Sequence, residues 1–312
     1  MLTIKNIPEV STLTYDDLHI AVLDAHRKGS HLRSEALMDQ YIQTAMGADL
    51  GKALCLKANY LMLIDPRRSA EGLSLIEDAM LVAEGDSDLQ MKCIIAGLGL
   101  CYMMGDVRRA ARYESLAHQL LMEYAGAPSV YPVSCHLCFN LAHIDSLKQE
   151  HTQAYWHLVQ GTRMLLAAPG AEADEARCML FKFYLRTAEV CLQLDRSPEG
   201  EDALNKARAY TVHATDELLW QISWAEHLLA TKQPERAAQV LDELTHHSQL
   251  APATLVRFHL TRGLAAQALG DFRAFHHHLA KAQLIAVNHA QDHLLGKIQR
   301  VMRTPARLEA IR

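Results

Sequence analysis

Apolar residues recur along most of this chain at intervals of three and four positions. Clear examples are Ala237, Val240, Leu241 and Leu244, and later Leu279, Ala282, Ile285 and Ala286. This spacing places apolar side chains on one face of a helix, whereas strands would show alternation. The prolines lie between such segments or in first helical turns, where they do not interrupt a helix. The pattern predicts an all-α protein.

One packing signature repeats six times between residues 60 and 282, four times cleanly. A compact marker residue is followed twelve positions later by a second marker, and usually by another small residue seven positions further on. The clearest sets are Ala142/Ala154/Gly161, Ala188/Gly200/Ala207, Ala225/Ala237 and Gly263/Phe275/Ala282. An offset of twelve corresponds to helix, tight turn and helix, and its repetition is typical of a solenoid.

The repeat predicts seven antiparallel helix pairs followed by a closing helix. The pairs cover about 14–46, 49–84, 87–124, 130–167, 172–212, 215–248 and 251–288, and the closing helix covers about 290–303. The first pair fits the signature poorly, as a terminal cap would. One superhelical domain is therefore expected over residues 14–303, with an N-terminal segment at 1–13 and a tail at 304–312.

These residues resemble the tetratricopeptide repeat. The resemblance rests on two sets of positions, Gly105, Asp106, Ala110 and Ala117, and Gly263, Gly270, Asp271 and Ala282. It implies a right-handed α-solenoid in which small residues let paired helices approach closely. The second-helix markers are 38, 44, 46, 37 and 38 residues apart, longer than the typical repeat of about 34. Long irregular units resemble the sensor domains of maltose-activator-type and peptide-sensing bacterial regulators.

Composition narrows the classes of function. Half of the residues are apolar, and the formal net charge is -5 without a long run of either sign. This balance argues against a nucleic-acid surface, which needs clustered cations. The sequence shows no bilayer-spanning stretch and no signal peptide, so we expect a cytoplasmic protein. The seven cysteines fall in predicted first helices, which is typical of small buried thiols and not of a disulfide framework.

No motif for catalysis, a metal or a cofactor is visible. Cys135 and Cys138 share a helix face, but a structural zinc site needs four ligands and no second pair has suitable spacing. Consecutive histidines, as at 276–278, point about 100° apart on a helix and cannot easily converge on one ion. We therefore expect a protein without cofactor, metal or enzymatic activity.

The candidate site lies on the predicted inner face, which the first helices should line. Positions six and two before each first-helix marker, and one after it, should point into the groove. This count selects His136, Asn140 and His143 in the fourth pair and Lys182, Arg186 and Glu189 in the fifth. Tyr102 adds an aromatic side chain to the expected lining.

Part of this set resembles the tetratricopeptide carboxylate clamp, which grips the terminal carboxylate of a peptide. Asn140, Lys182 and Arg186 occupy places where such clamps carry an asparagine, a lysine and an arginine, and Lys92 occupies the place of a second lysine. Ala96 stands where a second asparagine is expected. Solvated groove charges without a ligand remain the alternative interpretation.

The prediction for function is a binding module that holds a peptide, a protein segment or a small anionic ligand in its concave groove. The alternative is the sensory half of a transcription regulator that acts through a partner or through a DNA-binding domain outside this chain. In both cases the partners are proteins or peptides, not nucleic acids or membranes. The sequence leaves open whether two copies form a homodimer.

Overall fold

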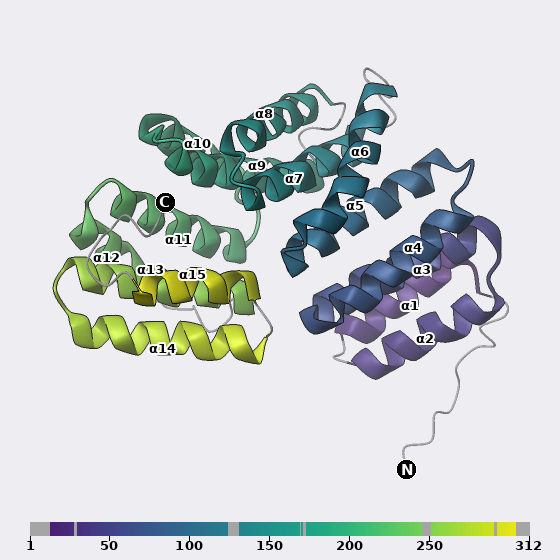
Figure 1. Cartoon of the computed structure of the whole chain (residues 1–312), viewed down its shortest axis with the longest axis horizontal. Coiled ribbons are helices and arrows are strands. Elements are labelled where there is room, and N and C mark those ends of the chain that lie inside the picture. The colour runs from purple at the N-terminus through teal and green to yellow at the C-terminus, as the bar shows by residue number, and fades with distance from the viewer. Residues whose placement is uncertain are drawn as a thin grey trace, which may run out of the picture. The chain divides into compact units, whose positions relative to one another are not determined.

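The structure is a computed structural model that describes residues 13–27, 30–123, 131–168, 170, 173–244, 251–289 and 292–303. Within these ranges the regular elements are fifteen α-helices and one short 3-10 helix, without a strand (Figure 1). The all-α prediction is confirmed. Residues 1–12 of the expected N-terminal segment and the tail at 304–312 lie outside the described residues.

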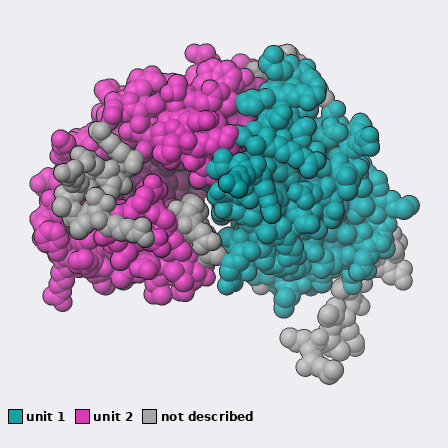
Figure 2. All heavy atoms as spheres, viewed as in Figure 1, with its two compact units in different colours: residues 1–123 teal, residues 124–312 magenta. Residues whose placement is uncertain are grey.

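The chain divides into two compact units, residues 1–123 and 124–312, which are coloured separately in Figure 2. Unit 1 contains α1 (Tyr15–Arg27), α2 (His31–Thr44), α3 (Gly47–Ile64), η2 (Pro66–Arg68), α4 (Ser69–Val82), α5 (Ser87–Met104) and α6 (Val107–Glu123). Unit 2 contains α7 (Tyr131–Leu147), α8 (His151–Ala167), α9 (Asp174–Gln193), α10 (Ser197–Ala209), α11 (Ala214–Ala230), α12 (Pro234–Asp242), α13 (Pro252–Ala268), α14 (Phe272–Asn288) and α15 (Asp292–Arg303).

The helices pair as the repeat predicts. Each odd-numbered helix from α1 to α13 packs against the helix that follows it, and α15 packs against the last pair. Seven helix pairs and a closing helix are therefore present, with boundaries within a few residues of those predicted except at the end of the sixth pair. There α12 ends at Asp242, and residues 245–248 of the predicted pair lie outside the described residues. The chain is an α-solenoid built from tandem helix pairs.

The same turn ends the first helix in the five pairs from α5–α6 onward. A residue with positive φ follows each first helix, and these residues are Gly105, Gln149, Asp195, Lys232 and Gly270. The amide of the next residue donates to a carbonyl five positions back, as in Asp106 N to Cys101 O at 2.9 Å and Gln233 N to Leu228 O at 2.8 Å. This is the Schellman arrangement, which satisfies helix-end carbonyls while it reverses the chain. A repeated turn of this kind fixes the geometry of each pair.

Two of the marker pairs twelve positions apart lie at close contacts between the paired helices. A Cβ atom added to Gly200 would lie 3.4 Å from the carbonyl oxygen of Ala188, and one added to Gly263 would lie 3.4 Å from that of Phe275. These are the marker partners that the sequence pattern selects. A larger residue at either glycine would therefore press against the backbone of the paired helix.

First helices of successive pairs also contact one another. In unit 1, α1 contacts α3 and α3 contacts α5; in unit 2, α9 contacts α11 and α11 contacts α13. The second helices of successive pairs make no comparable contact among the described residues. Elements on the inner side of a curved stack lie closer together than those on its outer side. The first helices α1, α3 and α5 therefore form the inner surface of unit 1, and α9, α11 and α13 that of unit 2.

Candidate functional site

The inner surface of unit 2 carries a network of ion pairs that joins three successive helix pairs. Arg257 of α13 lies 2.8 Å from the carboxylate of Glu189 on α9 and 2.7 Å from that of Glu226 on α11. Glu189 also accepts from Arg186 at 2.6 Å, one turn earlier on α9. The side chains of the four residues are 16% to 26% exposed. The network therefore lies at the surface but is largely shielded from bulk water.

Two hydroxyl groups complete the network. Arg257 donates to Ser223 Oγ at 3.2 Å, and the Thr261 hydroxyl donates to Glu226 Oε1 at 3.2 Å. Burial by itself raises the pKa of Glu189, but the positive charges of Arg257 and Arg186 outweigh this effect and lower the pKa to about 2. Glu189 is therefore ionised throughout the physiological pH range.

Lys182 differs from these residues because it is exposed and makes no ion pair among the described residues. It lies on α9 one turn before Arg186. His136, on α7, is also exposed, and its pKa is lowered by loss of hydration and by the positive charge of Lys182. The shift places a neutral ring beside an ammonium group at neutral pH. Lys182 can therefore offer its charge to an anionic group of a ligand.

Asn140 and His143 extend this surface along α7. Both side chains are half-buried. The ring of His143 packs edge-on against Phe139, with centroids 4.6 Å apart, and Phe139 in turn packs against Phe183 of α9 at 5.2 Å. An apolar and aromatic strip therefore borders the polar positions of α7 and α9.

Lys92 and Tyr102 belong to unit 1. Lys92 is exposed on α5, where its ammonium lies 2.6 Å from the carboxylate of Asp88, one turn away. Tyr102 is half-buried near the end of the same helix. That these two residues join Lys182 and Asn140 in one carboxylate clamp stays a prediction.

Four residues of the network escaped the sequence prediction, namely Ser223, Glu226, Arg257 and Thr261. The signal was present in the sequence. Counted from the markers Ala225 and Gly263, the same register positions used for Lys182, Arg186 and Glu189 select these four residues together with Leu219 and Leu264. The register count thus includes the polar positions of α11 and α13, and the ion pairs show that they meet those of α9.

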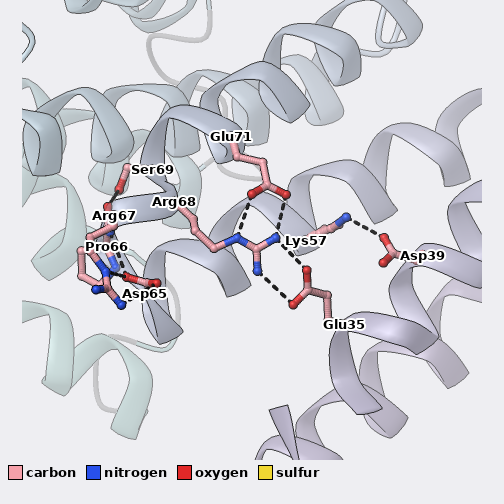
Figure 3. A network of polar contacts seen from close by, with 9 residues as sticks. All are labelled: Glu35, Asp39, Lys57, Asp65, Pro66, Arg67, Arg68, Ser69 and Glu71. Atoms are coloured by element: carbon pink, nitrogen blue, oxygen red, sulfur yellow. Dashed lines mark hydrogen bonds and ion pairs between the residues drawn. The ribbon is translucent and has the colours of Figure 1, made fainter. Parts of the chain in front are cut away.

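A second polar network lies in unit 1 (Figure 3). The guanidinium of Arg68 makes paired hydrogen bonds to Glu35 of α2, at 2.7 and 2.9 Å, and to Glu71 of α4, at 2.7 and 2.8 Å. Lys57 of α3 pairs with Asp39 of α2 nearby. Arg68 thus directs four hydrogen bonds at carboxylates of α2 and α4, so this network joins the first two helix pairs.

The candidate metal and redox residues are packed in the protein interior. Cys135 and Cys138 are 1% and 0% exposed, and burial raises the pKa of their thiols to about 11 and 12. Across the described ranges, no group of three or more histidine, cysteine, aspartate or glutamate side chains has a geometry that could hold a metal ion. None of the described helices is both long and apolar enough to span a bilayer.

A comparison with solved structures finds helical-repeat proteins whose fold is similar to that of this chain. A tetratricopeptide repeat protein from Parabacteroides merdae aligns with 91% of this chain and 98% of its own length, with a TM-score of 0.57 and 14% identity. The chain has a tetratricopeptide-like fold. A comparison with protein-family models gives no match, and one with curated proteins gives no significant match.

Two further structures share the tetratricopeptide-like fold. A Rap protein complexed with Competence and Sporulation Factor aligns with 96% of this chain and 86% of its own length, with a TM-score of 0.58 and 13% identity. BtubC from P. vanneervenii aligns with 72% of this chain and 91% of its own, with a TM-score of 0.50 and 17% identity. At these identities the likeness concerns the fold.

Proposed function

We propose that this chain is a binding module without catalytic activity, which holds a peptide or protein segment against the inner surface of its first helices. The acidic or carboxy-terminal groups of the ligand are bound at Lys182. The observation that carries the proposal is the exposed ammonium of Lys182, which lacks a carboxylate partner among the described residues and stands beside an extended polar network.

The charge balance of this surface favours an anionic group. Three cations, Lys182, Arg186 and Arg257, stand with two carboxylates, Glu189 and Glu226, although the whole chain has a net charge of -5. The two carboxylates are already engaged by the two arginines. A ligand carboxylate would therefore find its charge-assisted hydrogen bonds at Lys182.

The neighbouring side chains suit a peptide. Phe139 and His143 form an aromatic strip beside Asn140, and a peptide groove needs such a mixture of apolar and polar contacts. A fold of this kind holds a partner elsewhere, since the Rap protein of similar fold is complexed with Competence and Sporulation Factor. The proposed module is therefore a receptor for an extended segment.

Binding of short synthetic peptides tests the proposal. An array of peptides, each made with a free and with an amidated carboxy terminus, is screened against the full chain, and hits are measured by fluorescence anisotropy. Loss of one charge-assisted hydrogen bond in Lys182→Ala should weaken binding roughly tenfold. Higher salt should weaken binding to the wild type as well, because the contact is partly exposed to solvent.

Lys206→Ala is the matched control. Lys206 lies on the second helix α10 and is paired with Asp202 at 2.6 Å, so its loss should leave affinity unchanged. Equal affinity of the wild type and Lys182→Ala for every peptide that binds would refute the site. An array without any bound peptide would refute the peptide ligand.

A further inference from the structure

Two cysteines of unit 1 face each other across neighbouring helix pairs. The Sγ atom of Cys55 on α3 lies 3.2 Å from the Sγ atom of Cys93 on α5. The residues are 6% and 0% exposed and stand 38 positions apart in the chain. Among the described residues no other two cysteine sulfur atoms come within hydrogen-bonding distance. Five of the seven cysteines thus lack a sulfur neighbour, whereas these two share one contact.

The contact needs little movement to become a bond. A disulfide has an S–S length of about 2.04 Å, so the two sulfur atoms must approach by about 1.2 Å. The helices α3 and α5 already contact each other as successive first helices of the stack. We therefore expect rotation of the two side chains to supply most of this approach.

We propose that Cys55 and Cys93 form a reversible disulfide when the protein meets a hydroperoxide. The pair is an oxidation site that joins the second and third helix pairs through their inner helices. The sequence predicts that all seven cysteines are buried packing residues. Two of them, Cys55 and Cys93, are also placed to form a disulfide.

The first step oxidises Cys93. With Cys55 as the donor of the sulfur–sulfur hydrogen bond, the pKa of the Cys93 thiol is lowered and that of the Cys55 thiol is raised. The Cys93 thiolate attacks the terminal peroxide oxygen, so that an S–O bond forms, the O–O bond breaks and hydroxide or alkoxide leaves. The leaving group takes up a proton, and Cys93 becomes a sulfenic acid.

The second step closes the disulfide. The sulfur of Cys55 attacks the sulfur of the sulfenic acid, so that the S–S bond forms and the S–O bond breaks. The departing hydroxide takes the proton of the Cys55 thiol. With hydrogen peroxide, two thiols and one peroxide molecule thus give one disulfide and two molecules of water. Thiol–disulfide exchange with an external dithiol reverses the reaction.

Burial selects a small oxidant. Cys93 is fully buried and Cys55 is nearly so, so a bulky reagent, including a reducing dithiol, needs a wider local opening of the helices than a small oxidant does. Hydrogen peroxide is little larger than water and reaches such sites through local opening of helices. The closed disulfide removes conformational freedom from the unfolded chain over a 38-residue separation, so it should raise the melting temperature of the protein.

The test uses the full native chain and hydrogen peroxide. After treatment, free thiols are alkylated under denaturing, non-reducing conditions, and tryptic peptides are identified by mass spectrometry. We expect one cross-linked species that joins the Cys55 and Cys93 peptides, lost on reduction with dithiothreitol. The melting temperature of the oxidised protein should rise by roughly 5–10 °C, and reduction should return it to its starting value.

Two substitutions give the controls. Cys55→Ser should leave Cys93 to proceed to sulfenic and higher acids without a cross-link, whereas Cys101→Ser, a buried neighbour on α5, should leave the cross-link intact. The wild-type peptide map decides the matter even if Cys55→Ser fails to fold. Separate alkylation of Cys55 and Cys93, or sulfinic acid at Cys93 without a disulfide, would overturn the proposal.

Discussion

The guanidinium of Arg257 on α13 lies 2.8 Å from the carboxylate of Glu189 on α9, two helix pairs earlier in the chain. The intervening first helix, α11, contributes Glu226 to the same guanidinium. The side chain of Arg257 thus joins three helix pairs through partly shielded hydrogen bonds. An ion pair within a single helix cannot link separate helix pairs. This contact links the first helices α9, α11 and α13 on the inner surface of unit 2.

Arg257→Gln should reduce the pH dependence of stability. The pKa of Glu189 is about 2 in the folded protein against an unfolded value of 4.5, so its contribution is present above pH 4.5 and is lost as the pH falls towards 2. That contribution is on the order of 2–3 kcal/mol. Without Arg257, the pKa of Glu189 in the folded protein should move towards its value in the unfolded chain. Urea unfolding at pH 7 and pH 3 should therefore give closer free energies of unfolding than in the wild type.

Arg163→Gln provides the control for this measurement. Arg163 is exposed on α8 and forms no ion pair among the described residues, so its loss should leave the pH dependence unchanged. An Arg257→Gln protein with the pH profile of the wild type would show that Arg257 does not stabilise the Glu189 carboxylate.

Arg68 and the adjacent Arg67 should differ sharply in their effect on stability. Arg68 holds two carboxylates from α2 and α4. Arg67 is 70% exposed, and among the described residues its ion pair is with Asp65, two residues away. Loss of Arg68 removes four hydrogen bonds from Glu35 and Glu71, which then keep the electrostatic attraction of Lys57. We expect Arg68→Ala to lower the free energy of unfolding by about 1–3 kcal/mol and Arg67→Ala by less than about 0.5 kcal/mol.

Thermal and urea unfolding of the two variants measure this difference. The pKa values of Glu35 and Glu71 are lowered by their hydrogen bonds to Arg68. The stability that these carboxylates contribute is therefore present at neutral pH and is lost as the pH falls through their folded pKa values. Arg68→Ala should make unfolding less sensitive to acid, and similar losses in both variants would contradict the prediction.

Two helical glycines should respond in opposite directions to substitution by alanine. A Cβ atom at Gly161 of α8 would lie 2.5 Å from the ring of Phe183, which is fully buried, and 3.0 Å from Cys138 Cβ. At Gly99 of α5 a Cβ atom meets nothing within 4 Å. We expect Gly161→Ala to destabilise the protein by about 1–3 kcal/mol and Gly99→Ala to stabilise it by about 0.5–1 kcal/mol.

The measurement is urea unfolding of both variants beside the wild type. Gly99→Ala reports the gain in helix propensity alone, so the difference between the variants isolates the steric cost at Gly161. Equal free energies of unfolding for Gly161→Ala and Gly99→Ala would contradict the close approach of α8 to α9 at Gly161.

Lys232→Gly should stabilise unit 2. Lys232 lies in the turn after α11 and has a φ of 62°, a conformation that glycine occupies in the equivalent turns at Gly105 and Gly270. A side chain costs free energy in this region, so its removal should raise the free energy of unfolding by about 0.5–1 kcal/mol. Lys232→Ala retains the Cβ atom and should change little. Equal stability of the two variants would argue against the left-handed turn.

Part of the candidate site can be selected from the sequence by counting positions from each first-helix marker. Counting from Ala188 gives Lys182, Arg186 and Glu189, and in the structure Glu189 accepts from Arg186 and pairs with Arg257. The count could not tell that Arg186 would be held by Glu189 while Lys182 stays without an ion pair. Which side chains pair depends on the distance between α9 and α13. The spacing of residues within one helix carries no information about that distance.

The periodicity of three and four, the offset of twelve and the turn positions determined the helices and their pairing, because these are local properties of the backbone and of neighbouring residues. Tertiary structure alone decided which side chains meet between pairs, such as Arg257 with Glu189 and Cys55 with Cys93. Those contacts depend on the curvature of the stack. Curvature arises from packing of each pair on the next, summed over many residues far apart in the chain.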